Sequence, residues 1–338
     1  MFISILLECS LIFIFTLLFV KYIHKYAYSL GIIDVPNARS SHTNVIARGG
    51  GIGFFSAVIL VFPFFHFELL YTHIWAYLAI FIVFIVGVID DKHTAAPNVK
   101  FIVILLATFL LYLDGIIIDD IGTFFGITIY LGWFSLPFTI FAVVGFTNAL
   151  NLIDGIDGLS STLSIIILGA LGIVGYLHGD FFMLITALTF IVSLLAFLVF
   201  NWHPASIFMG DSGSLTLGFV ISLLSIKALA YISAVSILFL AAIPLLDTLY
   251  VIIRRKINKR SAFAPDKCHI HHLVNAYMEG SVKKTVLVLG LLQFMYTLFA
   301  LSLNKTIDEG ILLVLFIANL LLVYKVLMRV IKRLGREC

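Results

Sequence analysis

Four polar side chains recur at every third position in the segment GFTNALNLIDGIDGLSS, residues 145–161. They are Asn148, Asn151, Asp154 and Asp157. On a helix, this spacing keeps neighbouring side chains on adjacent turns of one face. The segment contains no Lys or Arg, so its carboxylates have no local ion-pair partner. Such carboxylates at the end of an apolar helix favour a metal ion or a cationic partner.

Three further aspartates lie in polar segments elsewhere in the chain. Asp90 and Asp91 end an apolar run, and Asp211 lies in the Gly- and Ser-rich sequence FMGDSGS. Taken alone, each could be no more than a helix boundary or an N-cap. Together with Asp154 and Asp157 they form a set of hard oxygen ligands. This set suits Mg²⁺, or alternatively Mn²⁺, with positions left for phosphate oxygens.

Basic and histidine residues in a later segment could bind an anion. Residues 254–260 include five Lys and Arg side chains, which could contact a pyrophosphate. Attraction to anionic lipid headgroups explains most of them as well. In CHIHH, residues 268–272, the side chains are too crowded in sequence for an ordinary tetrahedral zinc site. Hydrogen bonds from these histidines to phosphate or sugar are the favoured interpretation.

The composition is that of an integral membrane protein. Of the 338 residues, 62% are hydrophobic and 12% are charged, whereas soluble domains are about half apolar and a quarter charged. Apolar runs long enough to span a membrane recur along the whole chain and leave no soluble domain between them. We therefore expect a single membrane domain, residues 1–338, with no nucleic-acid partner.

The apolar runs predict an all-α polytopic protein with about eleven membrane-spanning helices. Their approximate ranges are 2–20, 51–67, 74–89, 100–113, 134–149, 161–177, 182–200, 212–227, 230–252, 284–303 and 310–327. The intervening stretch 114–133 mixes alternating apolar residues with Gly and Asp. This pattern favours a small β-hairpin near residues 116–131, on the outer face of the membrane.

The distribution of Lys and Arg predicts the orientation. With eleven spans, one side of the membrane collects nearly all of these cations, and the other holds only Lys227 and Lys305. The N-terminus is then outside and the C-terminus in the cytoplasm. The first span has no cleavage site and indicates an uncleaved anchor. Cys9, Cys268 and Cys338 have no plausible partners in this topology, so no disulfide is expected.

Five polar loops are predicted on the cytoplasmic side, where they could form one site. They are residues 21–50, 90–99, 150–160, 201–211 and 253–283. A purely structural membrane scaffold would not need five such loops on one side. A transporter remains an alternative of a different class. It would carry acids in the middle of its spans and show an internal repeat. The sequence shows no such repeat, and its acids cluster at the inner ends of the spans.

The order of the motifs gives a specific resemblance. The motifs run from DVPNAR (34–39) and RGG (48–50), through the aspartates above, to NWHPA (201–205), FMGD (208–211) and HIHH (269–272). In this order they resemble the polyprenyl-phosphate N-acetylhexosamine-1-phosphate transferases, which are membrane enzymes of glycosyltransferase family 4. The match covers all five polar loops.

The resemblance implies roles for the acids. Asp211 is expected to be the principal Mg²⁺ ligand, with Asp154 beside it. Asp90 and Asp91 are expected to bind or deprotonate the lipid phosphate and to assist the metal. Asp154 and Asp157 are expected to hold the nucleotide-sugar.

The resemblance also implies substrate-binding residues. Asn151 and Asn201 are expected near the nucleotide-sugar, and Phe208 is expected to stack on uracil. The remaining candidates are the basic and histidine side chains Arg48, Lys100, Arg254, His269, His271 and His272.

The implied reaction moves GlcNAc-1-phosphate from UDP-GlcNAc to undecaprenyl phosphate in the bacterial cytoplasmic (inner) membrane. Its products are UMP and undecaprenyl-pyrophosphoryl-GlcNAc, the first lipid-linked product on the way to a surface polysaccharide such as lipopolysaccharide O antigen. The sugar assignment depends on HIHH, because the branch that uses UDP-MurNAc-pentapeptide typically has three consecutive histidines. That sugar, or a deoxy-amino sugar, remains an alternative. The family also leads us to expect a homodimer.

Overall fold

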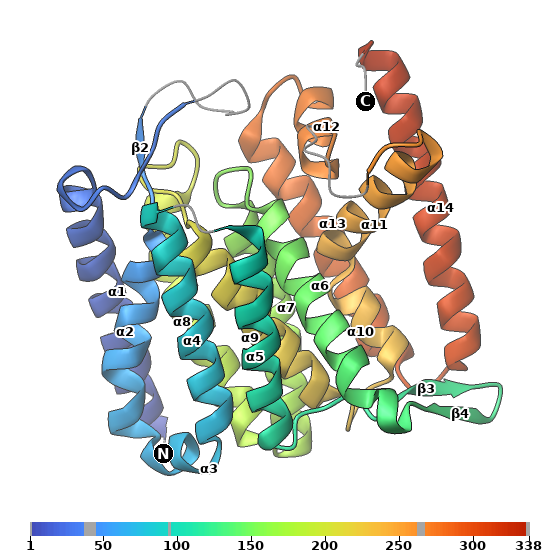
Figure 1. Ribbon diagram of the computed structural model, residues 1–338, viewed down its shortest axis with the longest axis horizontal. Coiled ribbons are helices and arrows are strands. Elements are labelled where there is room, and N and C mark those ends of the chain that lie inside the picture. Colours follow the sequence, from blue (N-terminus) through green and yellow to red (C-terminus); the bar gives the residue numbers. More distant parts are fainter. Residues whose placement is uncertain (1, 37–44, 94–95, 262–267, 336–338) are drawn as a thin grey trace.

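The structure is a computed structural model that describes residues 2–36, 45–93, 96–261 and 268–335. Most of the chain forms one bundle of long helices (Figure 1). In chain order the helices are α1 (Phe2–Leu30), α2 (Gly50–Phe65), α3 (Phe67–Thr72), α4 (Ile74–His93), α5 (Pro97–Leu113), α6 (Ser135–Ile153), α7 (Leu159–His178), α8 (Phe181–Asn201), α9 (Asp211–Ala228), α10 (Ala234–Leu240), α11 (Ala242–Ile257), α12 (Ile270–Tyr277), α13 (Val282–Leu303) and α14 (Glu309–Leu334).

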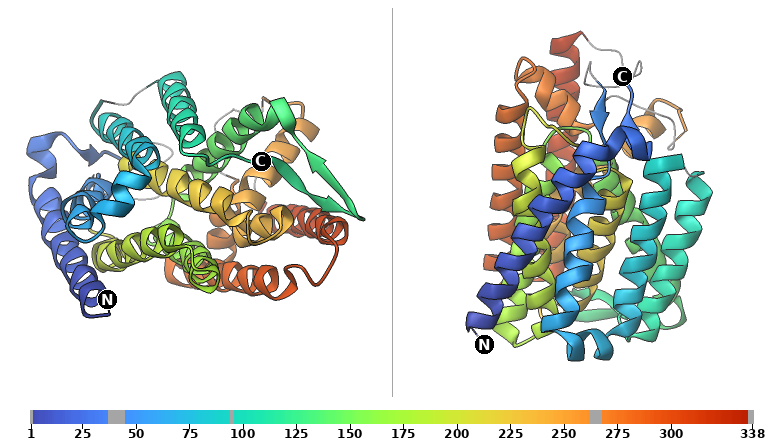
Figure 2. Two further views of the ribbon diagram at one scale, coloured as in Figure 1. Left: turned by 90° about the horizontal axis from the view of Figure 1, so that it is seen from below. Right: turned by 90° about the vertical axis from the view of Figure 1, so that its left-hand side faces the viewer.

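Helix α9 lies at the centre of the bundle (Figure 2), and nearly all of its residues are buried. Several of them are polar, and the hydroxyls of Thr216 and Ser222 are satisfied inside the helix, whereas the buried hydroxyl of Ser212 has no hydrogen-bond partner among the described residues. Thr216 donates to the carbonyl of Ser212 (2.6 Å), and Ser222 donates to the carbonyl of Gly218 (2.7 Å). Because the hydroxyls of Thr216 and Ser222 bond one turn back, α9 can be surrounded by other helices at these two positions without unpaired hydroxyls.

The chain is a multi-pass membrane protein. Among the described residues, seven helices are long and apolar enough to cross a membrane, namely α1, α4, α6, α7, α8, α13 and α14. An eighth span is counted if α10 and α11 form one broken span. Helices α2 and α5 are apolar but only 16 and 17 residues long. Each of the predicted runs thus coincides with helix, while the number of eleven crossings stays a prediction.

The ninth predicted run, 230–252, is not one straight helix. It divides into α10 and α11, which meet at 89°. Pro244 has no N–H to donate to the carbonyl of Leu240, so the helical ladder is interrupted there. Gln293 of α13 replaces the missing bonds: its amide donates to that carbonyl (2.7 Å), and its oxygen accepts from the N–H of Ile243 (3.0 Å).

The predicted hairpin is confirmed. Strands β3 (Asp120–Phe124) and β4 (Ile127–Tyr130) pair antiparallel, at the end of the bundle opposite the cytoplasmic loops predicted above (Figure 1). Carboxylates at the start of α14 hold the hairpin, since Glu309 accepts from the N–H of Thr123 (3.0 Å) and Asp308 from that of Phe125 (3.0 Å).

A second, smaller sheet lies at the other end of the bundle and was not predicted. Its strands are β1 (Ile33–Asp34) and β2 (Ile46–Ala47), which pair antiparallel. Ala47 also bridges to Ile207. Strand β2 therefore lies against the segment that enters α9.

Two glycines allow α2 and α4 to contact the start of α9 backbone to backbone. A Cβ on Gly51 would lie 2.1 Å from the nitrogen of Gly213, and one on Gly87 would lie 2.5 Å from the Cα of Ser212. Small residues permit such close helix contacts in membrane proteins. As a result, the polar ends of both helices lie beside Asp211.

We predict that Gly87→Ala lowers the thermal stability of the purified protein. Its new Cβ would overlap backbone atoms of α9, which cannot rotate away, and overpacking of this kind costs about 1–3 kcal/mol. The measurement is the midpoint of thermal unfolding in detergent. Gly169→Ala is the matched control, because no atom lies within 4 Å of its Cβ. Equal midpoints for the two variants would contradict the close contact.

Candidate active site

A polar cavity of about 330 Å³ lies among the loops at one end of the bundle. It is formed by the first loop, the turn between α6 and α7, the segment that enters α9, and one histidine. Its lining residues are Asp34, Arg48, Asn151, Asp154, Gly155, Ile156, Asp157, Asn201, Phe208, Met209, Gly210, Asp211 and His272. Four of the five predicted loops thus contribute to one cavity.

The four polar residues spaced by three do not share one helix. Helix α6 ends at Ile153, so Asp154 and Asp157 lie in the turn before α7. Gly158 is the last residue of this turn, directly before α7. Its φ of 73° is a left-handed conformation that favours glycine. The helix-face geometry therefore does not extend to the two aspartates, which lie in a turn within the predicted loop 150–160. The turn nevertheless presents both of them to the cavity.

Asp91 caps the N-terminus of α9 from a different helix. Its two carboxylate oxygens accept from the N–H groups of Asp211 (2.7 Å) and Ser212 (3.1 Å). These N–H groups have no partner within the helix, and an anion there is stabilised by the helix dipole. A Cβ on Gly210 would lie 2.6 Å from the carboxylate of Asp91, so only glycine fits at that position.

Two cations hold the three aspartates of this cluster together. Arg48 lies 2.9 Å from Asp91 through Nε and 2.8 Å from Asp211 through Nη2. Lys100 lies 2.7 Å from Asp90 and 2.5 Å from Asp211. Loss of one partner would leave the other charges uncompensated in a partly buried setting, which is strongly destabilising. This acid–base cluster, Arg48, Asp90, Asp91, Lys100 and Asp211, links the first loop to α4, α5 and α9.

Arg48 has carboxylate partners that keep it charged, whereas Asp154 has no cationic partner among the described residues. Burial alone would lower the pKa of Arg48, but the carboxylates of Asp91 and its neighbours raise it above the ordinary value, so Arg48 stays charged. Asp154 makes no ion pair with any described residue. Burial, followed by the nearby charge of Asp211, raises the pKa of Asp154 well above its usual range. Asp154 is therefore the cavity acid that most lacks a cation.

Asp157 and Asn201 fasten the turn after α6 to the segment after α8. The carboxylate of Asp157 accepts from Nδ1 of His203 (2.7 Å) and from the N–H of Ala205 (3.1 Å). The side-chain oxygen of Asn201 accepts from the N–H of Gly158 (3.0 Å). Both residues line the cavity, and both also fix the shape of its wall.

Phe208 and Asn151 are held at the cavity by bonds from neighbouring elements. The N–H of Phe208 donates to the carbonyl of Ala47 (2.9 Å), and its carbonyl accepts from the N–H of Gly50 (2.9 Å). The Asn151 amide donates to the hydroxyl of Ser214 in α9 (2.8 Å). Backbone pairing therefore sets the position of Phe208, and Asn151 ties α6 to α9.

The histidine segment is anchored by Asp247 of α11, whose side chain is fully buried. Its carboxylate accepts from Nδ1 of His269 (2.7 Å) and from the N–H of Ile270. His271 is 1% exposed, and a Cβ on Gly155 would lie 2.8 Å from its Nε2. Burial lowers the pKa of His271 to about 3, so its ring is neutral against the turn.

Two groups of residues carry side chains that could bind a metal ion. Within the described part of the chain, Asp247, His269 and His271 are the only three His, Cys, Asp or Glu residues with ligand atoms within 4.8 Å of one another. Since both oxygens of Asp247 already accept hydrogen bonds, this group is better explained as an anchor. Asp211 and Asp154 offer oxygen donors in the cavity. Asp154 makes no ion pair with any described residue, and both side chains offer hard oxygen donors to the same cavity, so these residues fit Mg²⁺.

Several predicted site residues lie outside the cavity lining. Arg254 is buried, and its guanidinium donates to the carbonyl of Cys268 (3.1 Å). Asp90, Asp91 and Lys100 belong to the acid–base cluster, while His269 and His271 lie behind His272. The sequence analysis missed His203, Ser214 and the anchoring role of Asp247. A single acid inside the apolar run 230–252 was the available signal for Asp247.

The expectation of no disulfide is wrong for Cys268, which is disulfide-bonded, whereas Cys9 is free. Cys338 lies outside the described residues. The prediction of no disulfide considered only which side of the membrane each cysteine lies on. It could not show that the end of α14 lies against α12, where Arg333 donates to the hydroxyl of Tyr277 (3.4 Å).

Comparison with known proteins identifies the family. The sequence model of glycosyl transferase family 4 matches residues 73–229. A probable undecaprenyl-phosphate N-acetylglucosaminyl 1-phosphate transferase of Bacillus subtilis (strain 168) is 34% identical, over 89% of this chain and 85% of the relative. The undecaprenyl-phosphate alpha-N-acetylglucosaminyl 1-phosphate transferase of Salmonella typhi is 30% identical, over 79% of this chain and 75% of the relative. The enzyme of the same name from Escherichia coli O157:H7 is 29% identical, over 92% of this chain and 88% of the relative. This chain therefore belongs to glycosyl transferase family 4.

Proposed function

We propose that this chain transfers GlcNAc-1-phosphate from UDP-GlcNAc to undecaprenyl phosphate and releases UMP. The relatives named above carry this activity in their names, and the chain spans three quarters or more of each. The observation that supports the proposal most is the cavity shared by Arg48, Asp154 and Asp211 at one end of the helices. A lipid phosphate at the membrane surface and a soluble nucleotide-sugar can meet there.

The proposed reaction exchanges one pyrophosphate bond for another. An oxygen of the lipid phosphate attacks the β-phosphorus of UDP-GlcNAc, and the bond to UMP breaks. A phosphate monoester has a second pKa of about 6, so the nucleophile is largely ionised without a strong base. Catalysis then consists mainly of positioning two anions and offsetting their repulsion. Arg48, which lines the cavity, offers positive charge there, and Lys100 bonds Asp211 from outside the lining.

The remaining residues have proposed roles that follow from their contacts. Asp91 positions Arg48 and the start of α9, because both of its oxygens are already engaged there. Phe208 provides a ring at the cavity for the uracil base, and His272 provides a hydrogen-bonding group for sugar or phosphate. When bound by Asp211 and Asp154, Mg²⁺, or Mn²⁺, supplies charge neutralisation to the phosphate oxygens.

We also propose that the cavity end of the bundle faces the cytoplasm of a bacterium, across its inner membrane. The helix ends around the cavity carry most of the Lys and Arg residues, as the positive-inside rule requires. Helices α1 and α14 support this topology, since the start of α1 and the end of α14 lie at opposite ends of the bundle (Figure 1).

A transfer assay tests the proposed function. Purified protein is mixed with undecaprenyl phosphate, Mg²⁺ and labelled UDP-GlcNAc, and both UMP release and label in the lipid phase are followed. Transfer that is lost with a chelator is the expected result. Transfer only from UDP-MurNAc-pentapeptide or a deoxy-amino sugar would keep the chemistry and overturn the sugar. No transfer from any UDP-sugar by protein that still binds one would sink the proposal.

We predict that Asp211→Asn lowers the transfer rate at least about a hundredfold, the usual cost of losing one charge-stabilising group in an active site. The substitution removes the charge shared by Arg48, Lys100 and the bound metal. Asp180→Asn is the matched control, because Asp180 pairs with Lys227 (3.5 Å) away from the cavity and Asn also caps helices well. A transfer rate of Asp211→Asn within twofold of that of Asp180→Asn would contradict the assignment of Asp211 to the active site.

We predict that Asp247→Asn lowers kcat about tenfold or more, because the residues that orient active-site groups typically cost that much when lost. Asp114→Asn is its control, since Asp114 also accepts from a histidine, Nδ1 of His73 (2.8 Å), but far from the cavity. The measurements are kcat, KM and the thermal midpoint of both variants. Similar midpoints with loss of kcat only in Asp247→Asn support the anchoring role. Equal kcat values would refute it.

A further inference from the structure

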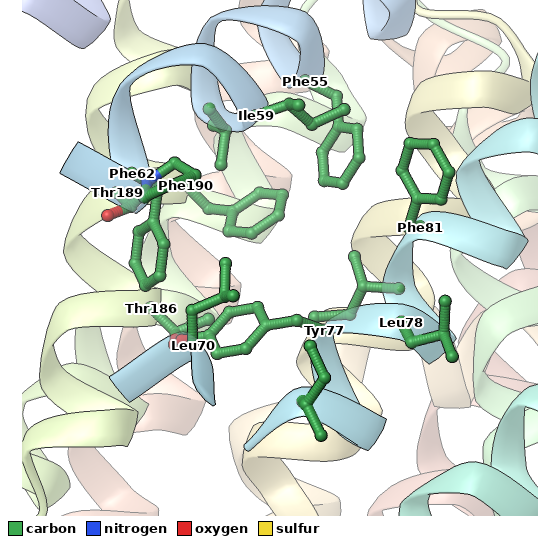
Figure 3. Close-up of a pocket in the computed structure, with 14 residues that line it drawn as sticks. Phe55, Ile59, Phe62, Leu70, Tyr77, Leu78, Phe81, Thr186, Thr189 and Phe190 are labelled. Atoms are coloured by element: carbon green, nitrogen blue, oxygen red, sulfur yellow. Dashed lines mark hydrogen bonds between the residues drawn. The ribbon is translucent and has the colours of Figure 1, made fainter. Parts of the chain in front are cut away.

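A second cavity, of about 230 Å³, lies between α2, α3, α4 and α8. Figure 3 shows its lining, which is almost entirely aliphatic and aromatic. Phe55, Ile59 and Phe62 come from α2, Leu70 comes from α3, and Tyr77 and Phe81 come from α4. Nothing in the proposed reaction uses this cavity.

Aromatic pairs bridge α2 and α4 at both ends of the cavity. The rings of Phe55 and Phe84 have centroids 4.4 Å apart, and those of Phe62 and Tyr77 have centroids 5.1 Å apart. The cavity is lined from both helices, by Phe55 and Phe62 of α2 and by Tyr77 and Phe81 of α4. It therefore lies between two helices that these aromatic contacts connect.

The cavity opens toward the lipid side of the bundle. Its outer residues Ile59, Leu78 and Phe81 are 40%, 38% and 41% exposed, whereas Thr186 and Phe190 in its rear wall are 1% and 2% exposed. The hydroxyl of Tyr77 bonds that of Thr186 (3.1 Å), so these polar atoms of the lining are already paired. In a membrane protein such an opening meets hydrocarbon instead of water.

We propose that this cavity binds one acyl chain of a bilayer phospholipid, which enters sideways between α2 and α4. An apolar cavity of about 150 Å³ suffices to bind benzene, so this larger one accommodates a segment of hydrocarbon chain. Its chemistry matches that of the phase that surrounds its opening. The inference rests on the membrane placement of the chain and not on the transferase reaction.

The position of the cavity favours a phospholipid over the acceptor's isoprenoid tail. Phe81 precedes Asp90 by nine residues, which is about 14 Å along a helix, and Leu70 lies still further from the acid–base cluster. A phospholipid of the leaflet beside α3 can reach the cavity directly. A tail anchored by its phosphate at the polar cavity would have to run at least that far across the bilayer before it reached the opening.

Photolabelling of the full-length protein tests this proposal. The protein is reconstituted in vesicles of phosphatidylethanolamine and phosphatidylglycerol that contain a phosphatidylcholine with a diazirine in one acyl chain. After illumination, labelled residues are mapped by mass spectrometry. Label on Thr186, Thr189 or Phe190 is expected, because lipid outside the bundle cannot reach these buried side chains. A rear wall without label would overturn the proposal.

Ile59→Trp provides the blocking variant. Ile59 lies at the mouth of the cavity and is 40% exposed, so a larger side chain there obstructs entry without overpacking the interior. Label on the rear wall should fall to the background of unilluminated samples. The control is Ile173→Trp. Ile173 is a 52% exposed residue of α7, so this substitution should leave the label on the rear wall unchanged. Equal labelling of both variants would contradict entry through this mouth.

A competition experiment identifies the source of the chain. Excess undecaprenyl phosphate should leave the label on the rear wall unchanged. Loss of that label would assign the cavity to the isoprenoid tail and would overturn the acyl-chain assignment.

Discussion

The capping of α9 by Asp91 is the contact on which the rest of the active site depends. A buried helix N-terminus needs acceptors for its free N–H groups, and Asp91 supplies both from α4. The resulting negative charge attracts Arg48, which in turn bonds Asp211. Lys100 completes the cluster from α5. One charge network therefore holds together elements that are more than a hundred residues apart, and it places Asp211 at the cavity.

The bundle around this contact is adapted to bring backbones together. Gly51 and Gly87 remove the side chains that would separate α2 and α4 from α9. Thr216 and Ser222 of α9 satisfy their hydroxyls within the helix, which suits its buried position. The histidine segment is fixed separately, through the buried carboxylate of Asp247. The cavity thus has two independent supports, one made of ion pairs and one made of a buried hydrogen-bonded acid.

The sequence predicted what local patterns determine. Apolar runs indicated where helices occur, the mixed stretch near 116–131 indicated the hairpin, and the motif order indicated the family. Features that depend on distant partners were not predictable. The break between α10 and α11 depends on Gln293, about fifty residues away, and the end of α6 at Ile153 separates aspartates that spacing had placed on one face. The number of crossings, the orientation and the homodimer remain predictions.

We propose that Asp211 and Asp154, and not the histidine cluster, hold the catalytic metal beside the nucleotide-sugar. Anomalous scattering from Mn²⁺, in crystals of the protein grown with UDP-GlcNAc, tests this directly. The account predicts one Mn²⁺ peak in the polar cavity, at coordination distance from a carboxylate oxygen of Asp211 and from the bound pyrophosphate. A peak instead among Asp247, His269 and His271 would contradict it.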